Sequence, residues 1–326
     1  MLSTSVAEEG SSGALARLLH LARTAPGAVY LLIALTVGLS LTTPGFLSVV
    51  NLTNVLLQGA VLTIVALGMT LVILTEGIDL SLGPLLGLCG VVSAMLVVAG
   101  WPLGLAMLAA IVVGIGFGTL NGALVAYAGL PPFLVTLGSF GMAMSLAMAL
   151  TEGNSVTGLP EIIRWFNEGA FLGVPVPVWA MAAMFALTWV LLYRTKFGRY
   201  VFAIGGNRRA LELSGVPVRT YHTAVYAYAG LLAALASFIM TARMNAAHPT
   251  IGVGLEFDAI AAVILGGTSF EKGRGGIIGT VIGALAVGTL RNGMNLVGIS
   301  TEWQVATVGI VIILAVAADA LRGLND

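Results

Sequence analysis

Residues 80–151 read LSLGPLLGLCGVVSAMLVVAGWPLGLAMLAAIVVGIGFGTLNGALVAYAGLPPFLVTLGSFGMAMSLAMALT, a run of 72 residues without an Asp, Glu, Lys or Arg. A membrane-spanning helix needs about 20 predominantly apolar residues, so this run has room for three of them. Inside a bilayer only helices and closed barrels satisfy every backbone polar group, and continuous apolar runs indicate helices rather than barrel strands. The run therefore predicts an all-α integral membrane protein surrounded by lipid.

The rest of the 326-residue chain continues this pattern, with 58% hydrophobic and 9% charged residues. Hydropathy, together with breaks at Pro, Gly and charged residues, predicts ten helices, at 26–43, 52–75, 80–99, 102–127, 132–151, 175–193, 220–243, 257–270, 275–297 and 301–321. The eighth is too short to cross a bilayer and is expected to form a broken pair with the ninth, packed inside protein. Glycines surround its end, namely Gly266, Gly267, Gly273, Gly275 and Gly276.

The distribution of Lys and Arg predicts the orientation in the membrane. With both termini in the cytoplasm, most of the cations lie on that side: Arg17, Arg23, Arg194, Lys196, Arg199, Arg208, Arg209, Arg219, Lys272, Arg274 and Arg322. Only Arg164, Arg243 and Arg291 fall elsewhere, which is a strong positive-inside bias. We therefore expect a cytoplasmic tail at 1–25, a transmembrane domain at 26–321 and a cytoplasmic tail at 322–326.

The densest group of cations is the cytoplasmic loop RTKFGRYVFAIGGNRRALELSGVPVR, residues 194–219, which indicates a contact site for something in the cytoplasm. Within this loop Asn207 is suited to N-cap a short helix from Arg208 to Ser214. Gly215 is suited to end that helix in the left-handed conformation, and Pro217 prevents its continuation. The alternative is a solvated connector whose cations only set the topology.

Composition argues against several classes of function. The net charge is zero, so no basic surface for nucleic acid is indicated. The only lysines, Lys196 and Lys272, do not stand before Ser or Thr in a glycine-rich phosphate loop, so this chain is not expected to hydrolyse ATP. His20, His222 and His248 lack metal-ligand spacing, so no metal site is predicted. We expect neither catalytic residues nor a cofactor in this chain.

The break TEGIDLSLG, residues 75–83, carries an acidic residue close to a helix start. Asp79 is predicted to cap the third helix by accepting backbone N–H groups there. Coupling to an ion is the alternative, although proton-coupled carriers usually place the ionisable group inside a span.

Two segments suggest an internal repeat. GTLNGALVAYAGL (118–130) lies in the fourth predicted helix and GTLRNGMNLVGI (288–299) in the ninth. Copies separated by five spans point in opposite directions, as in a 5+5 inverted repeat. Chance similarity is the alternative, because Gly, Leu and Ala are so common in this chain.

Four motifs together resemble the ribose-type permease subunits of sugar-importing ABC transporters. They are GMTLVILTEGIDLSLG (68–83), RTKFGRYVFAIGGNRRALELSGVPV (194–218), LEFDAIAAVILGGTS (255–269) and RNGMNLVGIS (291–300). The resemblance extends over residues 45–320 in the same order. It implies a multi-pass permease in a bacterial inner membrane that translocates a monosaccharide.

The resemblance also implies the partners. A second permease chain, cytoplasmic ABC ATPase subunits that bind ATP and Mg, and a periplasmic sugar-binding protein are expected. The cytoplasmic loop would then contain the segment that couples to the ATPase, formed by Gly205, Gly206, Asn207, Arg208, Arg209, Ala210, Leu211, Glu212, Leu213, Ser214 and Gly215.

The chain departs from the family pattern at Glu76, and at Glu271 and Lys272, where small or glycine-rich sequence is usual. These departures leave the identity of the sugar open. Two other functions compete with the importer. A stand-alone ion-coupled transporter is disfavoured by the absence of mid-span carboxylates and by the dense cytoplasmic loop, and an intramembrane enzyme lacks any cluster of catalytic residue types.

Uncharged polar residues within spans are candidates for the translocation path, because lipid offers them no hydrogen-bond partner. They are Ser93, Asn121, Thr136, Ser139, Asn292 and Asn295, and the alternative is that they join helices. The outer connections 152–175 and 245–258 are predicted to dock the binding protein through Glu161, Glu168 and Glu256, since complementary charge speeds association.

Overall fold

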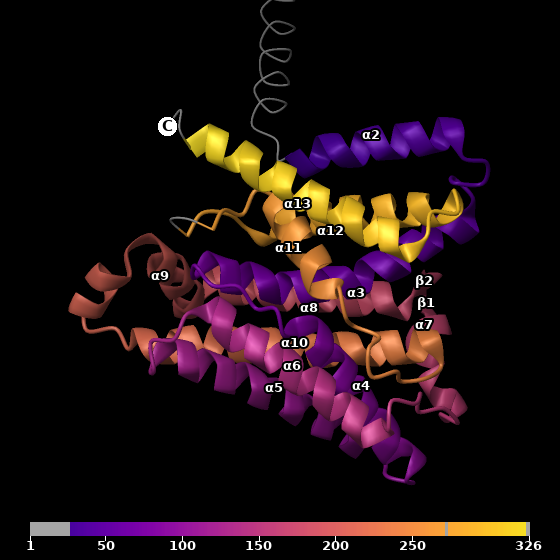
Figure 1. The fold of residues 1–326 in the computed structure, drawn as a ribbon, viewed down its shortest axis with the longest axis horizontal. Helices are drawn as coiled ribbons and strands as arrows, with labels where there is room; N and C mark the ends of the chain where they lie inside the picture. Colours follow the sequence, from indigo (N-terminus) through magenta and orange to yellow (C-terminus); the bar gives the residue numbers. More distant parts are fainter. Residues whose placement is uncertain (1–26, 271–272, 324–326) are drawn as a thin grey trace, which may run out of the picture.

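The computed structural model describes residues 27–270 and 273–323, and in it helices pack side by side into one elongated bundle (Figure 1). The long helices are α2 (Gly27–Thr42), α3 (Val49–Leu74), α4 (Leu82–Val98), α5 (Leu103–Ala126), α6 (Pro132–Thr151), α8 (Val176–Arg194), α9 (Lys196–Leu213), α10 (Val218–Met244), α11 (Leu255–Leu265), α12 (Ile277–Leu296) and α13 (Thr301–Gly323). The ten predicted helices are all present. The predicted tail 1–25, residues 324–326 of the C-terminal tail, and Glu271 and Lys272 lie outside the described residues.

Within the described residues, six helices are long and apolar enough to cross a membrane, namely α3, α5, α6, α8, α10 and α12. Three shorter apolar helices accompany them, at Gly27–Thr42, Leu82–Val98 and Thr301–Ala317. The chain is thus an all-helical, multi-pass membrane protein.

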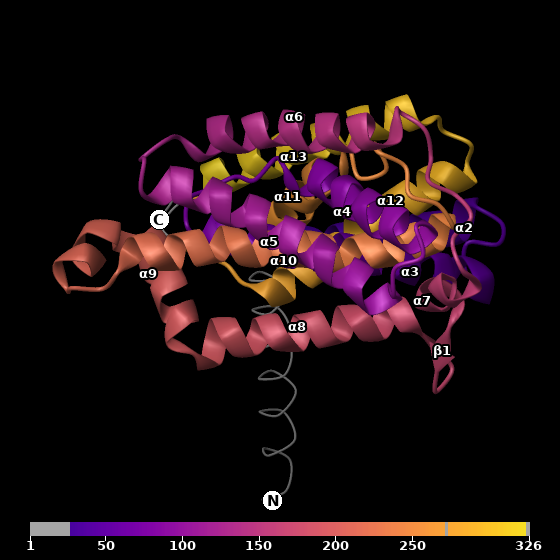
Figure 2. The ribbon, with the colours of Figure 1, turned by 90° about the horizontal axis from the view of Figure 1, so that it is seen from below.

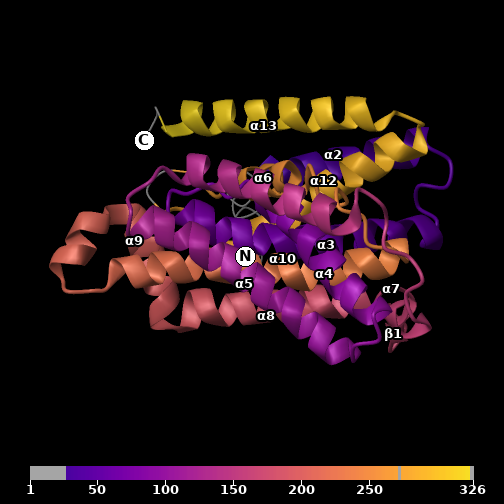
Figure 3. The same ribbon diagram turned by 60° about the horizontal axis from the view of Figure 1, so that its bottom comes forward.

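The helices form an inner group and an outer group. The most apolar part of α3 is 83% buried within the chain, whereas that of α8 is 17% buried. Buried side chains of α3, α4, α10 and α11 form the main core, while α2, α5, α6 and α13 expose many large apolar side chains. An apolar outer surface is expected of a chain that lipid surrounds. Helix α13 lies along one edge of the bundle (Figure 3).

Glycines let α5 and α10 cross at close range. A Cβ at Gly118 of α5 would collide with the backbone of Tyr226, and one at Gly122 would lie 2.7 Å from the Cα of Thr223. Membrane helices lack a hydrophobic drive to associate and rely on such close backbone packing through small residues. The glycine row on α5 therefore fixes its position on α10.

The predicted short eighth helix is confirmed. Helix α11 has 11 residues, which is too few to cross the bilayer, and most of its side chains are buried. It ends at Leu265, five residues before the predicted end at 270, because Gly266 and Gly267 follow it. Gly266 packs directly on Gly279 of α12, so α11 and α12 form a tight pair.

The bundle has two different ends (Figures 1 and 2). At one end, called the α9 end, helix α9 projects beyond the other helices, and α13 ends on the same side. The other, called the hairpin end, carries η1 (Glu161–Ile163), α7 (Trp165–Glu168) and an antiparallel hairpin of β1 (Ala170–Phe171) and β2 (Val174–Pro175). The sequence predicts residues 152–175 only as a connection outside the membrane, without these short elements.

Candidate functional site

Helix α9 is broken where the sequence predicts a cap. Asn207 has φ −157° and ψ 83°, which divides α9 into two helices. Its side-chain Oδ1 accepts a hydrogen bond from the backbone N–H of Ala210 at 2.9 Å, as an N-cap does. Ser214 follows the last helical residue, and Gly215 has φ 78°. The predicted short helix and both of its caps are confirmed.

The first half of α9 is fixed to the bundle. A Cβ at Gly205 would collide with the carbonyl oxygen of Leu74 and would lie 2.9 Å from the Cα of Gly273. Val201 and Ile204 are buried. The segment 205–215 therefore starts from a rigid base at the end of α3.

The second half of α9 presents an apolar side chain to solvent. Leu213 is 81% exposed, and Arg209 and Ala210 beside it are also exposed. Arg208 and Glu212 form an ion pair at 3.1 Å one turn apart, which adds little stability at such an exposed position. This leucine stands on a capped helix that projects beyond the bundle (Figure 1), so that helix can lay an apolar side chain into a partner's groove.

Arg208 also connects this tip to the interior. Its Nη1 lies 3.4 Å from Nδ1 of His222 on α10, and the His222 and Tyr226 rings have centroids 5.7 Å apart. A Cβ at Gly77 would collide with the hydroxyl of Tyr226, so this tyrosine reaches the turn between α3 and α4. A continuous line of side chains thus joins the α9 tip to that turn.

At the end of this line lies a buried polar cluster, consisting of Asp79, Ser81, Asn121, Thr136 and Ser139. Asp79 Oδ1 accepts hydrogen bonds from the backbone N–H of Ser81 at 2.9 Å and from its hydroxyl at 2.6 Å. The Asn121 amide donates to the Ser81 hydroxyl at 3.0 Å, and the Ser139 hydroxyl donates to Asn121 Oδ1. Thr136 donates to the carbonyl of Ile78 at 3.1 Å. The cluster joins α4, α5 and α6.

The prediction that Asp79 caps the third helix needs correction. Helix α4 begins at Leu82, so the N-cap position belongs to Ser81 and Asp79 closes the turn before it. Burial raises the pKa of the Asp79 carboxyl, while hydrogen bonds from Ser81 oppose the rise. Among the described residues, Asp79 Oδ2 and the Tyr226 hydroxyl are buried without a hydrogen-bond partner.

Replacing Asp79 is expected to test whether this group acts as an acceptor or as a charge. Asp79→Asn keeps Oδ1, so its melting temperature in detergent should stay near that of the unmodified chain. Asp79→Leu leaves two donors of Ser81 unsatisfied, at about 1–3 kcal/mol for each buried group, and should melt well below it. Equal destabilisation by both substitutions would contradict the acceptor role and show that the charge is needed.

The other candidate path residues have separate partners. Asn292 on α12 and Asn51 on α3 are buried and exchange two amide hydrogen bonds, at 2.8 and 3.0 Å. Asn295 is exposed and accepts a hydrogen bond from Gln304 at 2.7 Å. Thus Asn121, Ser139 and Asn292 join helices, as the alternative interpretation of these residues predicts.

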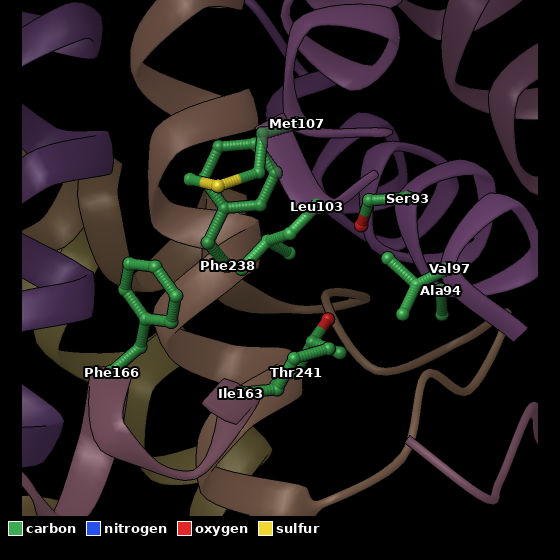
Figure 4. Close-up of a pocket in the computed structure, with 9 residues that line it drawn as sticks. All are labelled: Ser93, Ala94, Val97, Leu103, Met107, Ile163, Phe166, Phe238 and Thr241. Carbon is green, nitrogen blue, oxygen red and sulfur yellow. The ribbon is translucent and has the colours of Figure 1, made fainter. Parts of the chain in front are cut away.

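Ser93 borders a small cavity together with Thr241, Phe238 and Phe166 (Figure 4). Its volume is about 20 Å³, which is room for about one water molecule. The hydroxyl of Ser93 donates to the carbonyl of Gly90 at 3.0 Å. This cavity is too small for a solute such as a sugar.

The two connections predicted to dock a partner meet at the hairpin end. Val156 and Ala247 form a two-way backbone bridge at 2.8 and 3.0 Å. Glu161 and Glu168 are exposed there, as docking residues must be. Glu256 is not: it is 0% exposed, and its carboxylate accepts a hydrogen bond from the N–H of Gly254 at 3.0 Å. The sequence interpretation of Glu256 as a surface acid was wrong because the loop before α11 folds over it.

Sequence reasoning missed several residues that the structure brings into these sites. Tyr226 and His222 stand one turn apart on α10, a spacing that would have placed both on one face. Asp258 on α11 pairs with Arg291 on α12, with Nε 2.6 Å from Oδ2. No local sequence pattern predicts the pairing of Asp258 with Arg291, because the two residues are far apart in the sequence.

Residues 51–316 match the family described as branched-chain amino acid transport system / permease component. The chain therefore belongs to this family of transporter permease components, and its role is transport rather than catalysis. The ribose import permease protein of Escherichia coli (strain K12) is 45% identical over 296 residues, covering 90% of this chain and 91% of that protein.

Two other sugar permeases are also similar to this chain over most of its length. The ribose import permease protein of Bacillus subtilis (strain 168) is 44% identical over 88% of this chain and 90% of that one. The D-allose transport system permease protein of Escherichia coli (strain K12) is 38% identical over 86% of this chain and 87% of that one. Among solved structures, PsaBC from Streptococcus pneumoniae in complex with Fab has a TM-score of 0.48 at 15% sequence identity, covering 83% of this chain and 92% of that one. This similarity carries no argument about the present chain.

Proposed function

We propose that this chain is the membrane-spanning subunit of an ATP-binding-cassette importer that moves a monosaccharide of the ribose or allose type. The observation that carries the proposal is the capped helix after Asn207, which holds the exposed Leu213 beyond the bundle. The similarity to ribose and D-allose permeases over most of the chain supports the sugar class.

The partners follow from this role. The α9 tip binds a cytoplasmic ATPase subunit, which holds the ATP and Mg; the chain itself binds no cofactor. A second permease chain completes the membrane unit, and a periplasmic binding protein delivers the sugar to the hairpin end. There the exposed Glu161 and Glu168 offer negative charge for its approach.

The same proposal sets the orientation in a bacterial inner membrane. The α9 end lies in the cytoplasm together with both termini, because Arg194, Lys196, Arg199 and Arg219 gather at that end. The five helices α2 to α6 form one half of a 5+5 inverted repeat, and α8 together with α10 to α13 forms the other. The transmembrane domain spans residues 26–321.

Reconstituted uptake tests this function. In proteoliposomes with its ATPase and binding protein, the chain should accumulate labelled ribose only when ATP is supplied on the cytoplasmic side. Uptake by the chain alone, driven by a proton or sodium gradient, would instead establish a secondary transporter. A complex with the Glu161→Gln and Glu168→Gln substitutions should bind the binding protein more slowly and with weaker salt dependence.

A further inference from the structure

A polar cavity lies between α3, α10, α11 and α12 near the hairpin end of the bundle. It has a volume of about 200 Å³. A single buried water needs only about 10–15 Å³, so the cavity has room for a small solute. Four polar side chains line it, one from each of these helices: Gln58, Arg243, Asp258 and Arg291.

Two of these side chains lack partners on the protein. Asp258 and Arg291 satisfy each other, with Nη2 to Oδ1 at 2.7 Å. By contrast, neither Arg243 nor Gln58 makes a hydrogen bond or an ion pair with any residue that the structure describes, although both are half-buried. A half-buried charged group that no protein atom pairs with has lost part of its hydration without compensation. The free donors of Arg243 and Gln58 therefore point to a ligand.

The lining matches a neutral polyhydroxy molecule. The guanidinium of Arg243 offers donors, the amide of Gln58 offers a donor and an acceptor, and Asp258 offers acceptor lone pairs. Val61, Leu62 and Ile251 supply an apolar wall for the C–H face of a sugar ring. Asp258 and Arg291 cancel each other's charge, so Arg243 leaves the lining with one positive charge, and an anion is the competing ligand that the labelling experiment separates from a neutral sugar.

We infer that this cavity inside a single permease chain is a binding station for the monosaccharide, held by Arg243 and Gln58, during its passage across the membrane. The inference rests on the proposed function and adds to it a place and two recognising residues. Arg243 provides the strongest interaction, because hydrogen bonds to a charged group exceed those between neutral groups.

Protection from thiol labelling tests occupancy directly. Cys89 is buried, and a Cys89→Ala background leaves the chain without cysteine. In that background Val253→Cys, at an exposed position of the cavity lining that is not one of the two recognising residues, should react with a small charged thiol reagent in the assembled complex in nanodiscs, and millimolar free ribose should slow the reaction several-fold. The matched control is Thr157→Cys, at an exposed position on the connection after α6, whose rate ribose should leave unchanged.

Transport provides the second measurement. Arg243→Ala should lower ATP-driven ribose uptake about tenfold or more, the loss expected for one charged hydrogen bond. Assembly with the ATPase and stimulation by the binding protein should persist, because Arg243 has no partner to lose within the described chain. Arg274→Ala, at an exposed arginine of the connection between α11 and α12, serves as the control and should transport normally.

Two results together would contradict the proposal that this cavity binds the monosaccharide: a labelling rate of the cavity cysteine that saturating ribose leaves unchanged, and normal ribose uptake by the Arg243→Ala complex. Protection by ribose 5-phosphate but not by ribose would overturn it as well and assign the cavity to anions. In both cases ATP-dependent ribose uptake by the unmodified complex would still stand, so the proposed function is judged separately.

Discussion

Replacing Leu213 with aspartate is expected to abolish capture of the ATPase subunit. Leu213 is 81% exposed at the α9 tip, and a helix that lays an apolar side chain into a partner's hydrophobic groove gains binding energy from burying it. A carboxylate in that pocket would lose the burial and add an unpaired charge. We expect affinity to fall roughly 100-fold, measured by co-purification and by light scattering of the mixed subunits.

Leu172 provides the matched control for this substitution. It is 80% exposed at the turn of the hairpin, at the opposite end of the bundle. Leu172→Asp should leave ATPase binding intact. If Leu213→Asp retained full affinity, the segment 205–215 would be a charged connector and the ATPase would bind elsewhere.

Substitution of Gly118 by leucine should prevent the chain from folding into a monodisperse species in detergent. A Cβ at Gly118 collides with the carbonyl of Tyr226, so α5 and α10 must separate, and no flexible side chain is there to move aside. Overpacking of this kind costs about 1–3 kcal/mol in ordinary cores and more where backbone meets backbone. The measurement is the melting temperature and elution profile.

Gly116 is the natural comparison, two residues away on the same helix. Nothing lies within 4 Å of a Cβ placed there, so Gly116→Leu should fold and melt like the unmodified chain. Equal behaviour of the two leucine variants would show that α5 and α10 are not held by close backbone packing. Gly118→Ala should fall between them, since it adds only the colliding Cβ.

Most of the helices were predictable because each physical signal for them is local. Apolar runs interrupted by Gly and Pro define their ends, and Asn207 with Gly215 defines the short helix of the α9 tip through capping alone. Helix α6 even has its predicted bounds, since Pro132 begins it and Glu152, in the left-handed conformation, follows it.

The partners of polar residues were not predictable, because they depend on which helices lie side by side. Asn51 and Asn292 are hydrogen-bonded although 241 positions separate them in the sequence. Asn121 donates to Ser81 only because α4, α5 and α6 lie close together there. Glu256 was misplaced for the same reason: its charge suggests a surface, whereas the loop before α11 encloses it. A single sequence carries periodicity and capping but not the order of helices in space.

The bridge between Val156 and Ala247 has a mechanical consequence. One residue follows α6 and the other follows α10, so these two helices are tied together at the hairpin end by two backbone hydrogen bonds. Separating them would cost about 1 kcal/mol for each bond, besides exposing the residues packed beneath. Any opening between the connections that follow α6 and α10 therefore has to break both of these bonds, and while they hold, the two connections move as one unit at that end.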